Sequence, residues 1–88
     1  MKKNVYSIHD EKAKAYTSPF FLNHNGEAIR AFEDIATDPK TAICKHKADY
    51  RLYRIAEYDD VKGEFVQLKQ PEMLMHALGY EPISKKEV

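Results

Sequence analysis

The sequence predicts an α+β fold, in which a small antiparallel sheet is packed by one main helix and by a short C-terminal helix. Three observations predict it: an aromatic-rich stretch around a glycine turn at 50–69, a helical period at 27–36, and short extended stretches near the N-terminus. The length of 88 residues is that of one domain. We assign the domain to residues 1–80 and interpret residues 81–88 as a polar C-terminal tail.

The most informative stretch runs from Ala48 to Lys69 and predicts a β-hairpin. Its first strand, at 50–58, holds three tyrosines and two aliphatic residues, which suit a half-buried pleated surface. The second strand, at 63–69, follows a polar turn in which Gly63 suits a position with positive φ. Together with the N-terminal strands, this hairpin is expected to form the sheet.

Strict alternation would divide the side chains of the first hairpin strand between two faces of the sheet. Tyr53, Ile55 and Glu57 would point to one side, and Leu52, Arg54, Ala56 and Tyr58 to the other. Neither set is purely apolar, so the sequence leaves open which face is turned inwards, and with it the register.

The N-terminal third predicts strands at edges of the sheet. Lys3 to His9 is the first strand, and Ala15 to Leu22 is a second extended stretch. Because Pro19 has no N–H to donate, this second strand lies at an edge or ends near Ser18.

Two helices are expected. The main one, at 27–36, has one apolar stripe and follows a cluster of N-capping residues. The stripe consists of Ala28, Ile29, Phe32, Ile35 and Ala36. A short second helix at 71–78 would begin with Pro71 in its first turn and end before Gly79. The stretch at 40–47 fits either a short strand or an ordered loop.

Charge is balanced over the whole chain but not along it. Fourteen basic residues match fourteen acidic ones, so net charge gives no argument for a nucleic acid or a membrane. Locally, the segment at 40–54 holds five cations against Asp49, whereas 57–64 holds four carboxylates against Lys62. No apolar run approaches the roughly 18 residues of a membrane span, and the Met-Lys-Lys start lacks the apolar segment of a signal peptide.

The residues do not predict catalysis, a metal site or a cofactor. The serines lack the surroundings of an activated nucleophile, and no glycine-rich phosphate loop is present. The four histidines do not pair at metal-ligand spacing, and Cys44, the single cysteine, offers no Cys-x-x-Cys. We therefore expect a non-enzymatic protein in a reducing compartment.

One candidate contact surface stands out, around the first hairpin strand. It combines cations, which follow phosphates, with tyrosines, on which bases stack. The candidate nucleic-acid-binding residues are Lys45, Lys47, Tyr50, Arg51, Tyr53 and Arg54. The same residues also fit a solvated sheet face on which arginine stems pack against rings, and the residues alone leave both readings open.

Three pieces in order also resemble a known family: KNVYSIHDEKAKAY, PFFLNHNGEAIRAFEDIATDP and KHKADYRLYRIAEYDD with its glycine turn, together covering about residues 3–69. The chain is similar to the small nonstructural DNA-binding proteins of gokushoviruses. These are single-stranded DNA phages of the Microviridae that include the chlamydia phages. The resemblance implies a protein of the host bacterial cytoplasm that acts in viral DNA replication, or in the switch to single-stranded genome synthesis and packaging.

We therefore expect a DNA-binding protein that prefers single-stranded over double-stranded DNA. Because a small sheet with an exposed edge is a poor core by itself, we also expect a homodimer. The alternative is an adaptor that docks on the phage replication initiator or on procapsid proteins without touching DNA. No membrane partner is expected.

Overall fold

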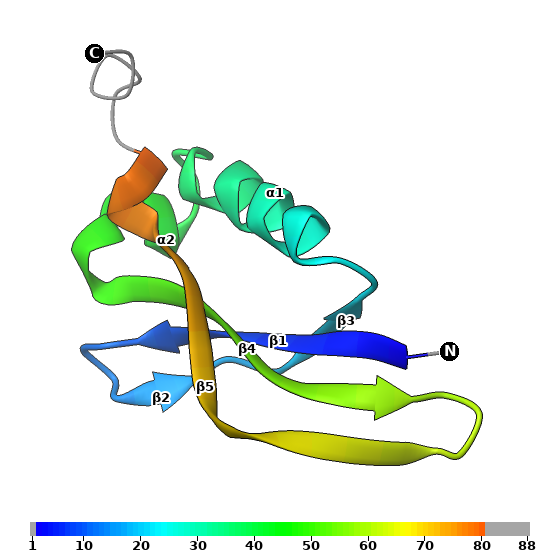
Figure 1. Cartoon of the computed structure of the whole chain (residues 1–88). Helices are drawn as coiled ribbons and strands as arrows, with labels where there is room; N and C mark the ends of the chain where they lie inside the picture. Colours follow the sequence, from blue (N-terminus) through cyan, green and yellow to red (C-terminus); the bar gives the residue numbers. More distant parts are fainter. Residues whose placement is uncertain (1, 81–88) are drawn as a thin grey trace.

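The computed structural model describes residues 2–80 and confirms the α+β class, with a five-stranded antiparallel sheet and one main helix (Figure 1). The strands are β1 (Lys2–Asp10), β2 (Ala15–Tyr16), β3 (Phe20–Leu22), β4 (Tyr50–Asp59) and β5 (Glu64–His76). The helices are α1 (Asn25–Ala36), α2 (Ala42–Lys45) and two 3-10 turns, η1 (Lys47–Asp49) and η2 (Ala77–Tyr80). The expected tail at 81–88 lies outside the described residues.

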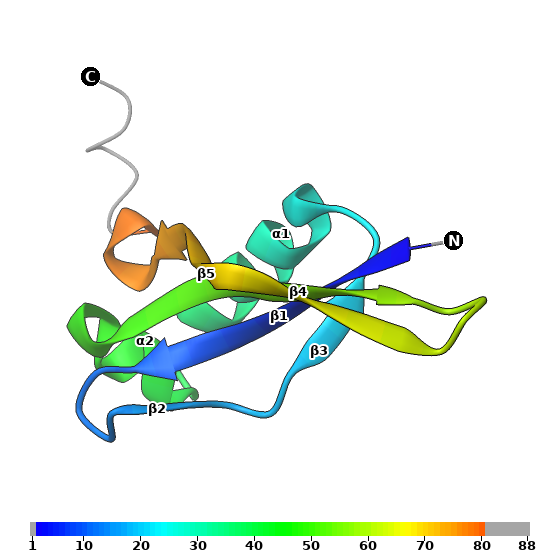
Figure 2. The same cartoon turned by 60° about the horizontal axis from the view of Figure 1, so that its bottom comes forward.

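The sheet has the order β2-β1-β4-β5, and β3 also pairs with β1. β1 is paired with β4 along its whole length, so β2 and β3 follow one another along its other edge. Pro19 lies between these two short strands, at the edge, as its missing N–H requires. Figure 2 shows this interrupted edge beside β1.

The predicted hairpin is confirmed as the pair β4–β5. In its turn Gly63 has a φ of +68°, and its N–H donates to the carbonyl of Asp59 at 2.7 Å. The Asp59 carboxylate accepts the N–H groups of Val61 and Lys62, at 2.9 and 3.2 Å, and these hydrogen bonds lower its pKa. The turn is therefore closed by its own backbone and by one aspartate side chain.

The expected helix at 71–78 is wrong, because β5 continues to His76 and only Ala77–Tyr80 turn into a 3-10 helix. Pairing with β4 places Glu72 opposite Arg54 and Met75 opposite Leu52. An isolated helix of eight residues is marginal, whereas the sheet satisfies the backbone of this stretch along its inner side. Pro71 is tolerated because β5 lies last in the strand order.

The register of β4 contains an extra residue that reverses its alternation. Val5 lies opposite Ala56, but the next residue, Tyr6, lies opposite Arg54, so Ile55 is a bulge. Tyr53 and Tyr58 consequently point to the same face, and Tyr53 and Glu57 to opposite faces. The division of β4 side chains between two faces that strict alternation predicts is therefore wrong, because the residues before and after Ile55 follow opposite alternations.

The core lies between α1 and the sheet. Phe32 is buried together with Tyr6, Ile8 and Leu52 of the sheet and with the alanines of the helix stripe, Ala28 and Ala36. Ile29 packs at the margin of this cluster, whereas Ile35 is exposed. The stripe that the sequence predicts is therefore the buried face of α1, apart from Ile35.

Local hydrogen bonds set the limits of the helices. The Glu27 carboxylate accepts the N–H groups of Asn23 and His24, both at 3.1 Å, so that α1 begins at Asn25. The stretch at 40–47, expected to be a short strand or an ordered loop, is instead helical at Ala42–Lys45, which form α2. The Thr41 hydroxyl caps this helix by accepting the Cys44 N–H at 3.1 Å.

We predict that Phe32→Ala destabilises the protein by about 3–5 kcal/mol, because it leaves a cavity at the centre of the core. Ile35→Ala, on the same helix but exposed, should cost about 1 kcal/mol or less. Unfolding midpoints in denaturant measure both. Equal costs would mean that the α1 stripe does not form the core.

Candidate nucleic-acid interface

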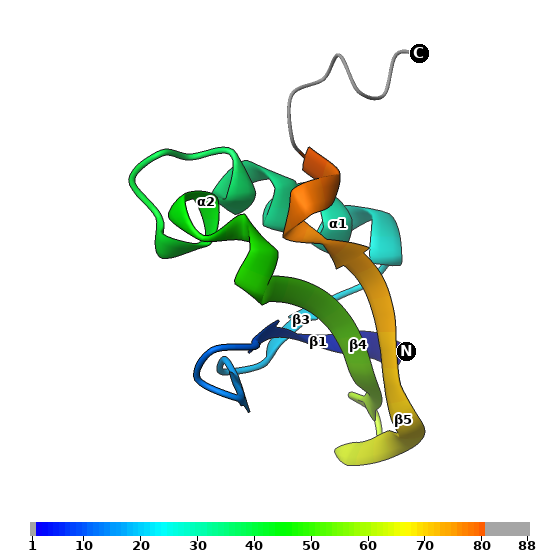
Figure 3. The ribbon, with the colours of Figure 1, turned by 90° about the vertical axis from the view of Figure 1, so that its left-hand side faces the viewer.

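The two faces of the sheet differ in what covers them. Tyr6 and Ile8 of β1 are buried against α1, so Lys3, Val5 and Ser7 between and beside them point away from it. The described helices all lie on the Tyr6 side, as Figure 3 shows. We call this side the covered face and the opposite side the open face.

The first aromatic cluster on the open face consists of His9, Tyr16 and Tyr53. The His9 and Tyr16 ring centroids lie 4.6 Å apart, those of Tyr16 and Tyr53 5.7 Å, and those of His9 and Tyr53 6.2 Å. The last two pairs meet edge to face, an arrangement that the ring quadrupoles favour. Three strands thus contribute one ring each: β1, β2 and β4.

The second aromatic cluster consists of Phe21, Tyr58 and Phe65, from β3, β4 and β5. Its ring centroids lie 4.9 to 6.1 Å apart. Val5 and Ala56 face this side and are 2% and 8% exposed. Since the described helices lie on the other face, the three rings account for their burial.

Between the clusters, the connection from β2 to β3 lies against β1. The hydroxyl of Ser7, which is buried, donates to the carbonyl of Thr17 at 2.7 Å. The Thr17 hydroxyl in turn accepts the N–H of Ile8 at 3.1 Å. This connection is held at fixed positions and joins the two clusters into one surface.

A large part of this aromatic surface is exposed. Tyr16 is 47% exposed, Phe21 42%, Phe65 62% and Met73, which lies opposite Tyr53, 52%. Single exposed apolar residues are ordinary, but a contiguous group on one face marks an interaction site. The open face is therefore the strongest candidate for a functional surface within residues 2–80.

Charge is also divided between the two faces. By register, the strand carboxylates lie on the covered face; they are Asp10, Glu57, Asp59, Glu64 and Glu72. The cations Lys3 and Arg51 lie on the open face, together with the imidazoles of His9 and His76. A polyanion would meet less repulsion on the open face than on the covered one.

Arg51 has a carboxylate partner at the margin of the open face. Its Nη1 donates to Oε1 of Glu11 at 2.8 Å, and His9 Nδ1 lies 3.4 Å from the same oxygen. Glu11 follows β1 in the turn to β2 and is about half exposed. This ion pair is exposed enough to be weak, so Arg51 can exchange its partner at little cost.

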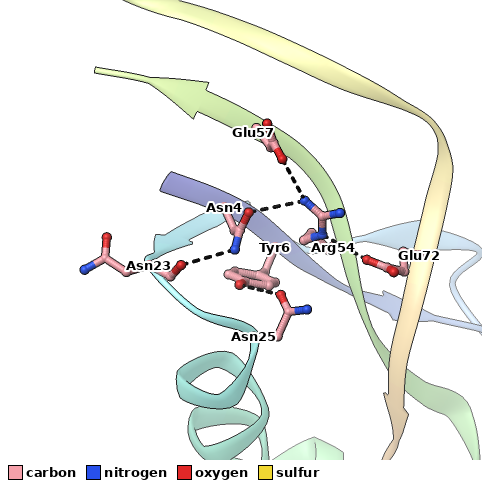
Figure 4. A network of polar contacts seen from close by, with 7 residues as sticks. All are labelled: Asn4, Tyr6, Asn23, Asn25, Arg54, Glu57 and Glu72. Atoms are coloured by element: carbon pink, nitrogen blue, oxygen red, sulfur yellow. Dashed lines mark hydrogen bonds and ion pairs between the residues drawn. The ribbon is translucent and has the colours of Figure 1, made fainter. Parts of the chain in front are cut away.

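Arg54 occupies a different environment, in a polar network on the covered face (Figure 4). Its guanidinium donates to Glu72 at 2.9 Å, to Asn4 at 3.2 Å and to Glu57 at 3.3 Å. The hydrogen bond to Glu72 contributes most to raising the pKa of Arg54. Arg54 therefore joins β1, β4 and β5 and is already saturated with carboxylates.

The same network connects the sheet to the start of α1. The Tyr6 hydroxyl donates to Asn25 Oδ1 at 2.9 Å, and the Asn4 amide donates to the Asn23 carbonyl at 3.3 Å. Burial raises the pKa of Tyr6, so its hydroxyl remains a donor at neutral pH. Figure 4 shows these contacts converging between the N-terminus of α1 and the sheet.

The structure separates the six candidates that the sequence suggests. Arg51 and Tyr53 lie on the open face, whereas Tyr50 and Arg54 lie on the covered face. The pKa of Tyr50 is raised by burial and by the Asp10 carboxylate. The two lysines, Lys45 and Lys47, lie outside the sheet in α2 and η1.

The segment that carries these lysines is nevertheless joined to the turn next to the first aromatic cluster. The N–H of Glu11 donates to the carbonyl of Asp49 at 2.7 Å, which ties η1 to the turn between β1 and β2. Lys12 and Lys14 lie in that turn and are exposed. Two separate segments that carry basic residues therefore meet at one end of the sheet, the left end in Figure 1.

Sequence reasoning missed most of the aromatic surface. Tyr16, Phe21, Tyr58 and Phe65 lie up to 49 positions apart in the sequence, and strand pairing alone brings them together. The one signal in the sequence was composition: strand segments that carry aromatic residues on both sides of a turn.

Two other kinds of site lack support in the described part of the chain. No helix within residues 2–80 has the length and apolar character needed to cross a membrane. In the same residues, no group of three or more His, Cys, Asp or Glu side chains is arranged as a metal site.

The fold and the open face define a small α+β protein with an aromatic, carboxylate-poor sheet surface. The chain belongs to the Phage ORF5 protein family, whose sequence model matches residues 3–80. It is therefore a phage protein. Comparison with curated proteins gave no match, and comparison with solved structures gave none either.

We predict that Arg54→Met lowers the free energy of unfolding by about 1–3 kcal/mol, because it leaves two carboxylates without their shared cation. Arg51→Met is the matched control in the same strand and should change it by under about 1 kcal/mol, since it removes one exposed pair. Denaturant unfolding of both variants measures the difference. A larger loss for Arg51→Met would contradict the assignment of the two arginines.

We also predict that His76 titrates below the ordinary imidazole pKa of about 6.5. Burial and the guanidinium of Arg51 lower its pKa, and its Nδ1 accepts the N–H of Leu78 at 3.0 Å. The unfolded chain binds more protons between the two pKa values, so this histidine removes stability as pH falls through that window. NMR titration should also show a higher pKa for His76 in Arg51→Met. A pKa at or above the ordinary value in the parent protein would contradict the burial of His76.

Proposed function

We propose that this protein is a non-catalytic DNA-binding protein of a single-stranded DNA phage and that it binds single-stranded DNA across the open face. The observation that supports this most is the pair of exposed aromatic clusters on a face without strand carboxylates. Stacking of a base on an aromatic side chain contributes about 1–3 kcal/mol and tolerates any sequence. Two clusters offer stacking positions for more than one nucleotide.

The aromatic surface favours single strands over duplexes. In a duplex the flat faces of the bases are stacked on each other, so rings on a protein surface cannot reach them. Rings such as Tyr16 and Phe65, exposed on a sheet, need bases that are free to turn outwards. Double-stranded DNA would interact through its phosphates alone.

The cations supply the second part of the proposed interface. Lys12 and Lys14 lie in the turn that follows His9 of the first aromatic cluster, and Lys3 lies opposite Tyr58 of the second. Lys45 and Lys47 belong to the segment on the covered side that is tied to the same turn through Glu11 and Asp49. Each phosphate that a cation neutralises releases counterions, so affinity falls as salt rises. We place the DNA backbone along the end of the sheet at this turn and the bases over the rings.

Membership of a phage family supports a role in the infected bacterium. We infer that the protein acts in the cytoplasm of the host, in viral DNA replication or in the switch to single-stranded genome synthesis and packaging. Coating a single strand as it is displaced would suit a protein that binds bases without sequence preference. The runner-up is an adaptor for the replication initiator or the procapsid, which would use the same exposed apolar surface.

We predict that Tyr53→Leu weakens binding to an oligothymidylate by about 5- to 150-fold, because leucine fills the space but offers no ring for stacking. Tyr50→Leu is the matched control: the same change in the same strand, on the covered face. Fluorescence anisotropy at low salt, with folding checked by circular dichroism, measures both affinities.

Salt dependence separates the two contributions. In Lys12→Gln/Lys14→Gln the slope of log affinity against log salt should flatten by up to about one unit per lost phosphate contact. In Tyr53→Leu the slope should stay near that of the parent. A Tyr53→Leu protein that binds as tightly as the parent would remove the open face from the proposal. No affinity of the parent even at low salt would favour the adaptor.

A further inference from the structure

The two edges of the sheet are protected to different degrees. One edge consists of β2 and β3, which are two and three residues long and are interrupted at Pro19. The other edge is β5, which is 13 residues long and lies last in the strand order. A long unpaired edge offers its backbone N–H and C=O groups to another strand.

β5 itself has a protected and an unprotected part. Gln67 lies opposite Ala56 but Glu72 lies opposite Arg54. The four residues 68–71 therefore form a large bulge opposite Ile55, and this bulge contains Pro71. Bulges and prolines are devices that block edge pairing. The segment before the bulge, 64–67, pairs regularly with β4 and has no proline. The hairpin that carries it extends away from the helices in Figure 1.

The two central side chains of this unprotected segment, Phe65 and Val66, are apolar and exposed. Val66 is 49% exposed and Phe65 62%. Next to them, Glu64 lies directly opposite Asp59, a like-charge pair that destabilises an isolated hairpin. Lys2 of β1 lies opposite Asp59 from the other neighbouring strand, so β4 separates Lys2 from Glu64. The edge therefore has exposed apolar surface and an excess of negative charge at its outer end.

We propose that a second copy of this chain pairs antiparallel with β5, about a twofold axis at Val66. Such an axis must stand perpendicular to the sheet, because only that operation places an antiparallel copy at the same edge. Val66 then lies opposite the partner's Val66, and Phe65 lies opposite the partner's Gln67, both within the unprotected segment. Glu64 comes level with the partner's Leu68, where the partner's bulge begins and the ladder ends. No like charges meet along this ladder.

The same register supplies a cation to the acidic end. The partner's Lys69 lies in its bulge, just beyond the ladder, on the side of the acidic turn that contains Asp60 and is flanked by Asp59 and Glu64. The arrangement is repeated at the other end of the ladder by symmetry. Charge complementarity and the apolar pair at the axis therefore both favour a second copy of this chain as the strand that pairs with this edge.

Pairing by this axis has a geometric consequence for the open face. A twofold rotation about an axis perpendicular to the sheet does not turn the sheet over. The open faces of the two copies therefore point the same way and form one surface. The second aromatic clusters of both copies, each with its Phe65, lie nearest the axis. Pairing at this edge does not require DNA, because it uses β5 alone.

Sedimentation of the full chain without DNA tests the proposal. The parent protein should be a dimer at micromolar concentration. Val66→Lys should raise the dimer dissociation constant at least 10-fold, because it places two ammonium groups against each other at the axis. Val61→Lys is the matched control: the same change in the same hairpin, at a turn residue that is 80% exposed. It should leave the dissociation constant within about twofold.

Cross-linking tests the register and does not depend on the folding of the lysine variant. Directly opposed residues of an antiparallel pair have Cα atoms about 4.5–5.5 Å apart, which suits a disulfide. In a Cys44→Ser background, Val66→Cys should form a disulfide-linked dimer under mild oxidation, and Val61→Cys should not. A monomeric parent would overturn the proposal, as would equal effects of the two lysine variants or equal cross-linking of the two cysteine variants. None of these results would bear on whether the open face binds DNA.

Discussion

Pairing between β1 and β4 is the interaction on which both faces of the molecule depend. It runs over the full length of β1 and brings Tyr6 and Ile8 beside Leu52, against which α1 packs. The single extra residue, Ile55, keeps Arg54 on the covered face while it moves Tyr53 to the same side as Tyr58. Without this bulge, the two aromatic clusters would lie on opposite faces of the sheet.

The two faces then have different physical roles. The covered face holds the apolar core, and its carboxylates are in part neutralised by Arg54. The contacts of Arg54 fix the strands to each other and, through Asn4, to Asn23, two residues before the start of α1. The open face uses rings instead of a helix to shield Val5 and Ala56 from water. In a chain of 88 residues this leaves aromatic surface exposed, and such surface is available to a ligand with flat apolar faces.

The sequence was sufficient where a signal is local. The period of Ala28, Phe32 and Ala36 predicts α1, and Gly63 with the tyrosines before it predicts the hairpin. The sequence was insufficient where pairing between strands that are distant in sequence decides the structure. Residues 71–78 carry apolar positions that fit a helix or a strand, and contact with β4, distant in sequence, selects the strand. The candidate site divides in the same way: Arg51 and Tyr53 can be named from one strand, but Phe21 and Phe65 meet only through the sheet.

The most direct test of the division into two faces is a titration of isotope-labelled protein with oligothymidylate at low salt, followed by NMR. Binding across the open face predicts shifts in the aromatic resonances of Tyr16, Tyr53, Phe21 and Phe65. It also predicts unchanged resonances on the outer side of α1, at Arg30 and Glu33. Shifts confined to α1, or spread equally over both faces, would contradict the account.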